Sequence, residues 1–314
     1  MIIKEPFNVY LAQGRFLSPS AYKNCNTPSE VWDKQKDPPS QDNPVFVFGH
    51  ALHTDRLEAK LFDSSVIIDR NEDYPVQDYN EVSGTISMRP KQNRNHRARL
   101  QMKAFMEGKE LLTKEQYDLL KKMVTAFPKY NPELVDLLDP EGAIIETSFY
   151  GKAIFSDKGI FEGFGDIPDL DYQPADNELL VKTRPDFLKP DRFYLDIKSI
   201  ESALPKLMAK ECINYGYDIQ AAFILDFCNF LLQQNEDTFF FLAFEKKKPY
   251  QSVLYLAPQR MIVTGRVKYQ ARLERLHKHE DNGYRVYATN PGDLFVEIPW
   301  PAYATLDEDS VINW

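Results

Sequence analysis

Apolar residues recur along the chain at two spacings, one typical of helices and one of strands, and together they predict an α/β fold. Helical spacing predicts helices over residues 21–32, 44–62, 97–107, 113–126, 202–210, 218–233 and 258–277. Runs of β-branched and aromatic residues predict strands over 66–69, 84–88, 143–150, 238–245 and 252–257, loops over 34–43 and 151–177, and a final apolar segment at 296–303. This order of elements predicts a mixed central sheet flanked by helices, in one domain of residues 1–314.

Residues 179–200 have the pattern of a β-hairpin, because two strand-like runs flank turn-forming residues around Asp191. A turn centred near Asp191 would set Asp186 opposite Asp196. Side chains alternate between faces along a strand, so Lys198 would share the face of Asp196. Two carboxylates and an ammonium are therefore expected on one patch.

This patch has the composition of a phosphodiesterase site. Hard divalent cations such as Mg²⁺ prefer oxygen ligands, which Asp186, Asp196 and the Ile197 carbonyl could supply. A lysine at position 198 could hold or deprotonate an attacking water, while Leu195 and Ile197 anchor the other face of the strand in the core. The same Asp-x-Lys string is also common on the solvated face of an antiparallel sheet, and the three residues alone leave both interpretations open.

Four other polar residues lie within apolar segments. His50 and His53 are one helical turn apart and lack the glutamate of a zinc-protease motif, so either could be a structural histidine. Glu146 lies in a predicted strand, where it needs a partner or a metal if buried, or faces water if the strand is at an edge. Gln220 lies on the buried stripe of the helix over 218–233, where it could reach a site or bond within the core.

Composition limits the class of protein. The chain has 314 residues, 43% of them hydrophobic and 13% aromatic, which indicates a folded protein. No apolar run approaches the length of a membrane span, so no membrane partner is expected. The three cysteines, Cys25, Cys212 and Cys228, form no Cys-x-x-Cys pair, which argues against a zinc knuckle or an iron–sulfur cluster and favours a reducing cytoplasm.

The net charge of -9 at first argues against a nucleic-acid partner. Residues 89–103, however, hold six cations and no acid, including Arg94, Arg97 and Arg99. These arginines could contact phosphates, or they could belong to a solvated loop that runs into a helix.

The ordered set of these motifs resembles the exodeoxyribonuclease VIII family, the phage-type double-strand exonucleases of the PD-(D/E)xK nuclease superfamily. The matching strings are GHALH at 49–53, LE at 57–58, IIETS at 144–148, KTRPDFL at 182–188, YLDIKS at 194–199, YGYDIQAAF at 215–223, FEKKKPY at 244–250 and PWPAY at 299–303. The resemblance covers most of the chain and implies the PD-(D/E)xK, restriction-endonuclease-like core.

The resemblance also implies roles. Asp186 and Asp196 would be metal-binding carboxylates, and Lys198 would position or activate water. His53 would be the active-site histidine near the metal, which leaves His50 outside the site.

For three further positions the resemblance is less complete. It places Glu146 at or beside the metal and lets Gln220 reach the active site to bond substrate or a catalytic group. Relatives carry a tyrosine four residues after this glutamine, where the present chain has Ile224. Tyr217, one helical turn before Gln220, is a possible substitute in substrate binding.

The function that the resemblance implies is a Mg²⁺-dependent, Mn²⁺-tolerant exonuclease that digests linear double-stranded DNA from a 5′ end and leaves 3′ overhangs for recombination. A ring-shaped homo-oligomer, a trimer or tetramer, would enclose the DNA, with a single-strand annealing protein as a possible partner in a bacterial cytoplasm. The alternatives are a structure-specific or restriction-like endonuclease on the same fold, and a non-catalytic DNA-binding recombination scaffold.

Overall fold

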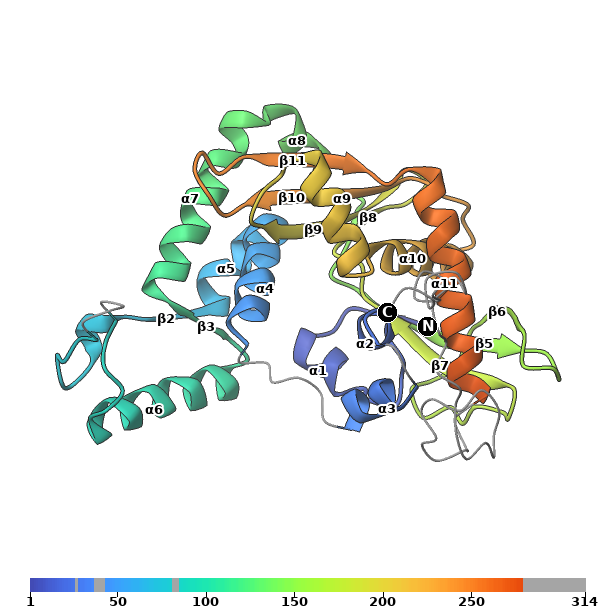
Figure 1. Ribbon diagram of the computed structural model, residues 1–314, viewed down its shortest axis with the longest axis horizontal. Coiled ribbons are helices and arrows are strands. Elements are labelled where there is room, and N and C mark those ends of the chain that lie inside the picture. Colours follow the sequence, from blue (N-terminus) through green and yellow to red (C-terminus); the bar gives the residue numbers. More distant parts are fainter. Residues whose placement is uncertain (26–27, 37–42, 81–84, 279–314) are drawn as a thin grey trace, which may run out of the picture.

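The structure is a computed structural model that describes residues 1–25, 28–36, 43–80 and 85–278 (Figure 1). The apolar segment predicted at 296–303 and most of the loop predicted at 34–43 lie outside the described residues. A single domain over residues 1–314 stays a prediction. None of the described helices is long and apolar enough to cross a membrane.

A five-stranded sheet forms the centre of the fold, with the strand order β11-β10-β9-β8-β4. Strands β9 and β10 are parallel and the other neighbours are antiparallel, so the sheet is mixed as predicted. The strands are β4 (Ile144–Ile145), β8 (Phe187–Lys189), β9 (Phe193–Ile200), β10 (Phe239–Glu245) and β11 (Ser252–Leu256).

Two smaller sheets accompany it. In the first, β5 pairs with β1, β6 and β7, and in the second β2 pairs with β3. Their strands are β1 (Ile2–Ile3), β5 (Ser148–Phe155), β6 (Phe161–Gly165), β7 (Glu178–Thr183), β2 (Val66–Asp69) and β3 (Glu110–Thr113).

Helices surround these sheets. They are α1 (Phe7–Ala12), α2 (Pro19–Tyr22), α3 (Pro28–Lys36), α4 (Pro44–Leu57), α5 (Ala59–Ser65), the 3-10 helix η1 (Asn71–Asp73), α6 (Lys91–Glu107), α7 (Lys114–Tyr130), α8 (Pro132–Leu137), α9 (Pro205–Asn214), α10 (Tyr217–Leu232) and α11 (Gln259–Lys278). Helix α6 lies with β2 and β3 at the lower left of Figure 1, away from β9.

Strand β9 lies between two hydrophobic cores. On one face Tyr194 packs in a core that includes Phe223 of α10, and on the other face Leu195 and Ile197 pack in a core that includes Ala51 of α4. The predicted division of β9 into two faces is confirmed. Both faces are covered, so the polar side chains of β9 are enclosed as well.

Several predicted elements are confirmed closely, including the helices α7, α10 and α11 and the strands β2, β10 and β11. Helix α7 begins after Thr113, whose side chain accepts from the Gln116 backbone while the Gln116 side chain accepts from Thr113, a capping box. The part of the hairpin next to its turn is also confirmed, since Phe187 pairs with Leu195 and this register sets Asp186 opposite Asp196.

Other predictions were wrong where a helix or strand is interrupted at a point that the sequence pattern does not mark. The helix expected over 21–32 is two helices, and the one over 44–62 breaks at Glu58. The loop expected over 151–177 contains the end of β5 and all of β6. In place of a strand over 84–88, the described residues have one isolated bridge, between Tyr79 and Ile86.

Two of the predicted strands are interrupted close to Glu146 and Asp186. The strand expected over 143–150 is interrupted at Glu146, which has a positive φ of 42°. The first strand of the expected hairpin is two strands, β7 and β8, which pair in different sheets. Pro185 separates them, and a proline cannot donate to a strand ladder.

Candidate active site

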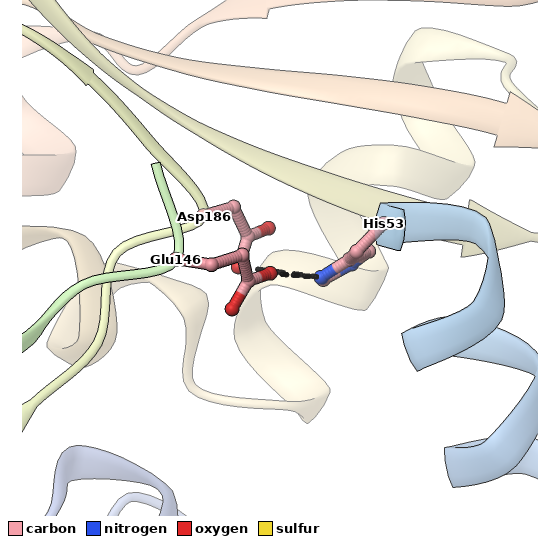
Figure 2. A group of neighbouring side chains, drawn as sticks. All are labelled: His53, Glu146 and Asp186. Carbon is pink, nitrogen blue, oxygen red and sulfur yellow. Dashed lines mark ion pairs between the residues drawn. The ribbon is translucent and has the colours of Figure 1, made fainter. Parts of the chain in front are cut away.

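Three ligand-type side chains from distant parts of the chain converge beside β9. His53 projects from α4, Glu146 lies in the bend between β4 and β5, and Asp186 precedes β8 (Figure 2). His53 Nδ1 lies 3.4 Å from Glu146 Oε1 and 3.4 Å from Asp186 Oδ1. One ligand atom from each residue lies within 4.8 Å of the others.

Backbone hydrogen bonds hold the two carboxylates side by side. The Glu146 N–H donates to the Asp186 carbonyl (3.1 Å), at the end of the β4–β8 pair. The Ile197 N–H donates to Asp186 Oδ2 (2.6 Å), which ties this side chain to β9. Glu146 has a positive φ, which interrupts the strand at this residue. Its side chain is buried beside Asp186 and does not face water, as it would on an edge strand (Figure 2).

The histidine ring has a defined orientation. His53 Nε2 lies 3.0 Å from the Ile197 carbonyl oxygen, which can only accept, so Nε2 carries a hydrogen. Nδ1 therefore faces the two carboxylates with either a proton or a free lone pair. Burial lowers the pKa of His53, but the Asp186 and Glu146 carboxylates outweigh it and raise the pKa to about 9.

The two carboxylates differ in their counterions. Burial would raise the pKa of Glu146, but His53 and Arg184 lower it to about 2. Arg184 Nε donates to Glu146 Oε2 (2.9 Å), and its Nη1 donates to the Glu5 carbonyl. Burial, with the charges of its acidic neighbours, raises the pKa of Asp186 to about 7.

The second half of the site lies on β9. Asp196 is 2% exposed, and its Oδ2 lies 2.5 Å from Lys198 Nζ. Gln220 Nε2 on α10 donates to Asp196 Oδ1 (3.0 Å). Burial lowers the pKa of Lys198, but Asp196 outweighs it and holds this pKa above its ordinary value, so Lys198 is an ammonium in the protein alone.

The residues fit a divalent cation. His53, Glu146 and Asp186 offer one nitrogen and two carboxylates from within 4.8 Å of one another. Asp196 Oδ2 is buried and, apart from the nearby ammonium of Lys198, has no hydrogen-bond partner among the described residues. Carboxylates with one imidazole suit Mn²⁺ as well as Mg²⁺.

Of three further residues, Tyr217 was predicted to take part in substrate binding, His50 was expected outside the site, and Ile224 stands where relatives carry a tyrosine. His50 is paired with Glu110 at 2.6 Å and does not join the cluster. Ile224, where a tyrosine was expected, is 1% exposed in the core. The ring of Tyr217 lies 4.6 Å from Lys198 Nζ, so Tyr217 contacts the site through the lysine.

The three arginines predicted to bind substrate lie on α6, which packs against β2 and β3. Arg97 Nη1 pairs with Asp69 at 2.5 Å, and Arg94 donates to the carbonyls of Met88 and Arg89. The structure does not bring these arginines to the His53 cluster. Contact between α6 and DNA stays a prediction.

Sequence reasoning missed two residues. Arg184 pairs with Glu146, and its position in a buried strand end just before Pro185 was a signal that could have found it. Lys23 Nζ donates to Gln220 Oε1 (2.7 Å). Nothing in the local pattern around Lys23 indicates this contact.

Two comparisons with known proteins bear on the fold. Residues 174–284, which contain Asp186, Asp196, Lys198 and Gln220, match the model of a PDDEXK-like domain of unknown function. The fold is similar to the crystal structure of a "putative exonuclease" from Eubacterium rectale, with a TM-score of 0.51, 10% sequence identity and 88% of each chain covered. No curated protein matches the sequence.

The mixed sheet, its helices and these two matches show the PD-(D/E)xK core that the sequence predicts, and they support the PD-(D/E)xK nuclease superfamily. The narrower resemblance to the exodeoxyribonuclease VIII family stays a prediction.

Proposed function

We propose that this protein is a metal-dependent exonuclease that hydrolyses linear double-stranded DNA. The observation that carries the proposal is the cluster of His53, Glu146 and Asp186 in a PD-(D/E)xK core whose register sets the Asp196–Lys198 pair opposite Asp186. Such a constellation supplies oxygen ligands for a cation and a fixed ammonium beside them.

The residues have separate tasks in this proposal. Asp186, Asp196, Glu146 and His53 would hold a divalent cation, which supplies Lewis-acid polarisation of the scissile phosphate and a bound water of lowered pKa. Lys198 is fixed by Asp196 at 2.5 Å and stays protonated, so it would orient the attacking water and offset charge on the phosphate rather than act as a base.

Hydrogen bonds already orient the histidine for this task. Its Nε2–H is committed to the Ile197 carbonyl at 3.0 Å, which leaves Nδ1 as the atom that faces the carboxylates. The Ile197 carbonyl, proposed from the sequence as a further ligand, is turned toward His53. Its proposed role is therefore to orient the imidazole, with cation binding as a second possibility only if that bond opens.

The finer parts of the proposal rest on the resemblance in sequence. They are digestion from 5′ to 3′, Mg²⁺ as the cation with Mn²⁺ as a substitute, a ring-shaped homo-oligomer of three or four copies, and an annealing protein as partner. An enclosed duplex would ease the conflict with the net charge of -9, because a ring needs few attractive contacts to stay on DNA.

The deciding experiment is a degradation assay with linear duplex DNA labelled at the 5′ end of each strand in turn. We expect degradation with Mg²⁺ or Mn²⁺, none with chelator, and none of closed circular DNA. Asp196→Ala and Lys198→Ala should abolish degradation while a gel-shift assay still detects DNA binding.

Each outcome has a distinct meaning. Cutting of closed circles would show an endonuclease instead. Metal binding by calorimetry without any cleavage would favour a non-catalytic scaffold. Full activity of Asp196→Ala or Lys198→Ala would show that this cluster is not the active site.

A further inference from the structure

We propose that Lys23 is a positioning residue for the active site and that it acts through Gln220 on the Asp196 carboxylate. The inference deepens the proposed nuclease function and rests on it. Lys23 lies 197 positions before Gln220 in the chain, outside residues 174–284 that match the PDDEXK-like domain.

Two hydrogen bonds link Lys23 to Asp196. Lys23 Nζ donates to Gln220 Oε1 at 2.7 Å, and Gln220 Nε2 donates to Asp196 Oδ1 at 3.0 Å. An ammonium has only donors and a carboxylate has only acceptors, so the amide between them has one satisfactory orientation. Lys23 thus keeps the amide N–H₂ of Gln220 directed at Asp196.

The consequence for Asp196 is a fixed carboxylate. With Oδ1 held by Gln220, Oδ2 is the oxygen left for Lys198 and for a cation. If the amide rotated, its carbonyl oxygen would face the carboxylate and repel it. Partners that orient a metal-binding carboxylate in this way typically change metal affinity or activity by about 10- to 100-fold when removed.

The fold seats Lys23 by a close backbone approach. Gly216 precedes α10 with a φ of 61°, and a Cβ at this position would lie 3.1 Å from both the Lys23 Cβ and the Lys23 carbonyl oxygen. The segment after α2 therefore packs directly on the start of the helix that carries Gln220. Any residue with a Cβ at position 216 would push the segment around Lys23 away from α10.

An aromatic ring supports both lysines. Lys198 Nζ lies 4.6 Å and Lys23 Nζ 5.2 Å from the centre of the Tyr217 ring. A ring face attracts cations, so Tyr217 helps to hold both amino groups near the site. Burial, and then the Lys198 ammonium, lower the pKa of Lys23 to about 7, and the neutral amine still has N–H groups that can donate to Gln220.

Lys182 offers a matched control, because its amino group also donates hydrogen bonds and contacts a tyrosine ring. Its Nζ donates to the carbonyls of Tyr10 (2.6 Å) and Gln13 (2.8 Å) and lies 4.4 Å from the Tyr10 ring. These partners are backbone groups at the end of α1. Loss of Lys182 should therefore lower stability without altering Asp196.

The test compares Lys23→Met, Lys23→Arg, Gln220→Met, the double variant Lys23→Met/Gln220→Met, and Lys182→Met. For each we measure kcat and KM on linear duplex, the Mn²⁺ affinity by calorimetry, and the thermal unfolding midpoint. We expect Lys23→Met to lower kcat about ten-fold or more with KM for DNA unchanged, and to weaken Mn²⁺ binding.

Non-additivity identifies the route. In the Gln220→Met background, Lys23→Met should cause no further loss, and Lys23→Arg, which keeps a donor, should retain most of the activity. Lys182→Met should keep the wild-type kcat and Mn²⁺ affinity at temperatures below its unfolding midpoint. If Lys23→Met does not fold, the Lys23→Arg and Gln220→Met variants still test the link.

Three results would overturn the inference: additive losses in the double variant, a raised KM with unchanged kcat, or equal losses in Lys182→Met and Lys23→Met. Failure of the proposed function looks different, since the wild-type protein itself would then degrade no DNA. In that case the Mn²⁺ affinities of the same variants still decide whether Lys23 orients Asp196.

Discussion

Replacement of Gly265 by alanine should destabilise the protein strongly, because this glycine lies where α11 crosses α10. A Cβ at Gly265 would lie 2.0 Å from the Asp218 carbonyl oxygen, 2.6 Å from its carbon and 2.9 Å from the Ala222 Cβ. The nearest atoms belong to the α10 backbone and cannot turn aside as a side chain can. The two helices would have to separate by about 1 Å or shift along each other to restore normal contact.

The cost follows from what this interface holds. Phe223 of α10 packs edge-on against Tyr269 of α11, and Arg266 pairs with Asp226 at 2.8 Å. Overpacking in a core typically costs about 1–3 kcal/mol and occasionally more, and a clash with backbone places Gly265→Ala at about 3 kcal/mol or above. Because α10 also carries Gln220, the shift should lower nuclease activity as well.

Gly49 is the matched control, since it also lies inside a helix, α4, but a Cβ there would have no neighbour within 4 Å. Alanine is favoured over glycine in a helix by about 1 kcal/mol, so Gly49→Ala should stabilise. The assay is urea unfolding followed by circular dichroism at one pH in chelator. A Gly265→Ala variant as stable as the wild type would show that α10 and α11 do not approach this closely.

Three further predictions concern the site. His53→Ala should lower the nuclease rate at least about ten-fold more than His50→Ala, and equal losses would mean that the wrong histidine was chosen. Arg184→Met removes a buried partner of Glu146 and should lower the free energy of unfolding by about 3 kcal/mol, which an unchanged urea midpoint would contradict. In chelator, this free energy should fall as pH rises from about 4 to 7, because the folded pKa of Asp186 (about 7) lies above its ordinary value of 3.8. Above pH 7 the raised pKa of His53 (about 9) and the lowered pKa of Lys23 (about 7) act in opposite directions. Asp186 binds its proton more tightly when folded; Asp186→Asn should flatten this fall, and a profile that rises between pH 4 and 7 would contradict the pKa shift.

The chain itself determined the central hairpin. Turn residues near Asp191 and the alternation along β9 predicted that Asp186 faces Asp196 and that Lys198 shares its face, and the register confirms this pairing. The prediction works because turn chemistry and side-chain alternation are local properties. Gln220 was likewise placed on a helix by its spacing, and the helix brings it to Asp196.

Only the tertiary structure decided what surrounds this hairpin. His53 and the Ile197 carbonyl are 144 residues apart in the chain, and Lys23 and Gln220 are 197 residues apart. At the break at Glu146, whose carboxylate lies 3.4 Å from His53, the Glu146 N–H donates to the backbone carbonyl of the distant Asp186. Hydrophobic periodicity reports which face of a helix or strand is buried, and it does not report which distant segment packs against that face. These contacts could therefore not be predicted from the pattern of either segment.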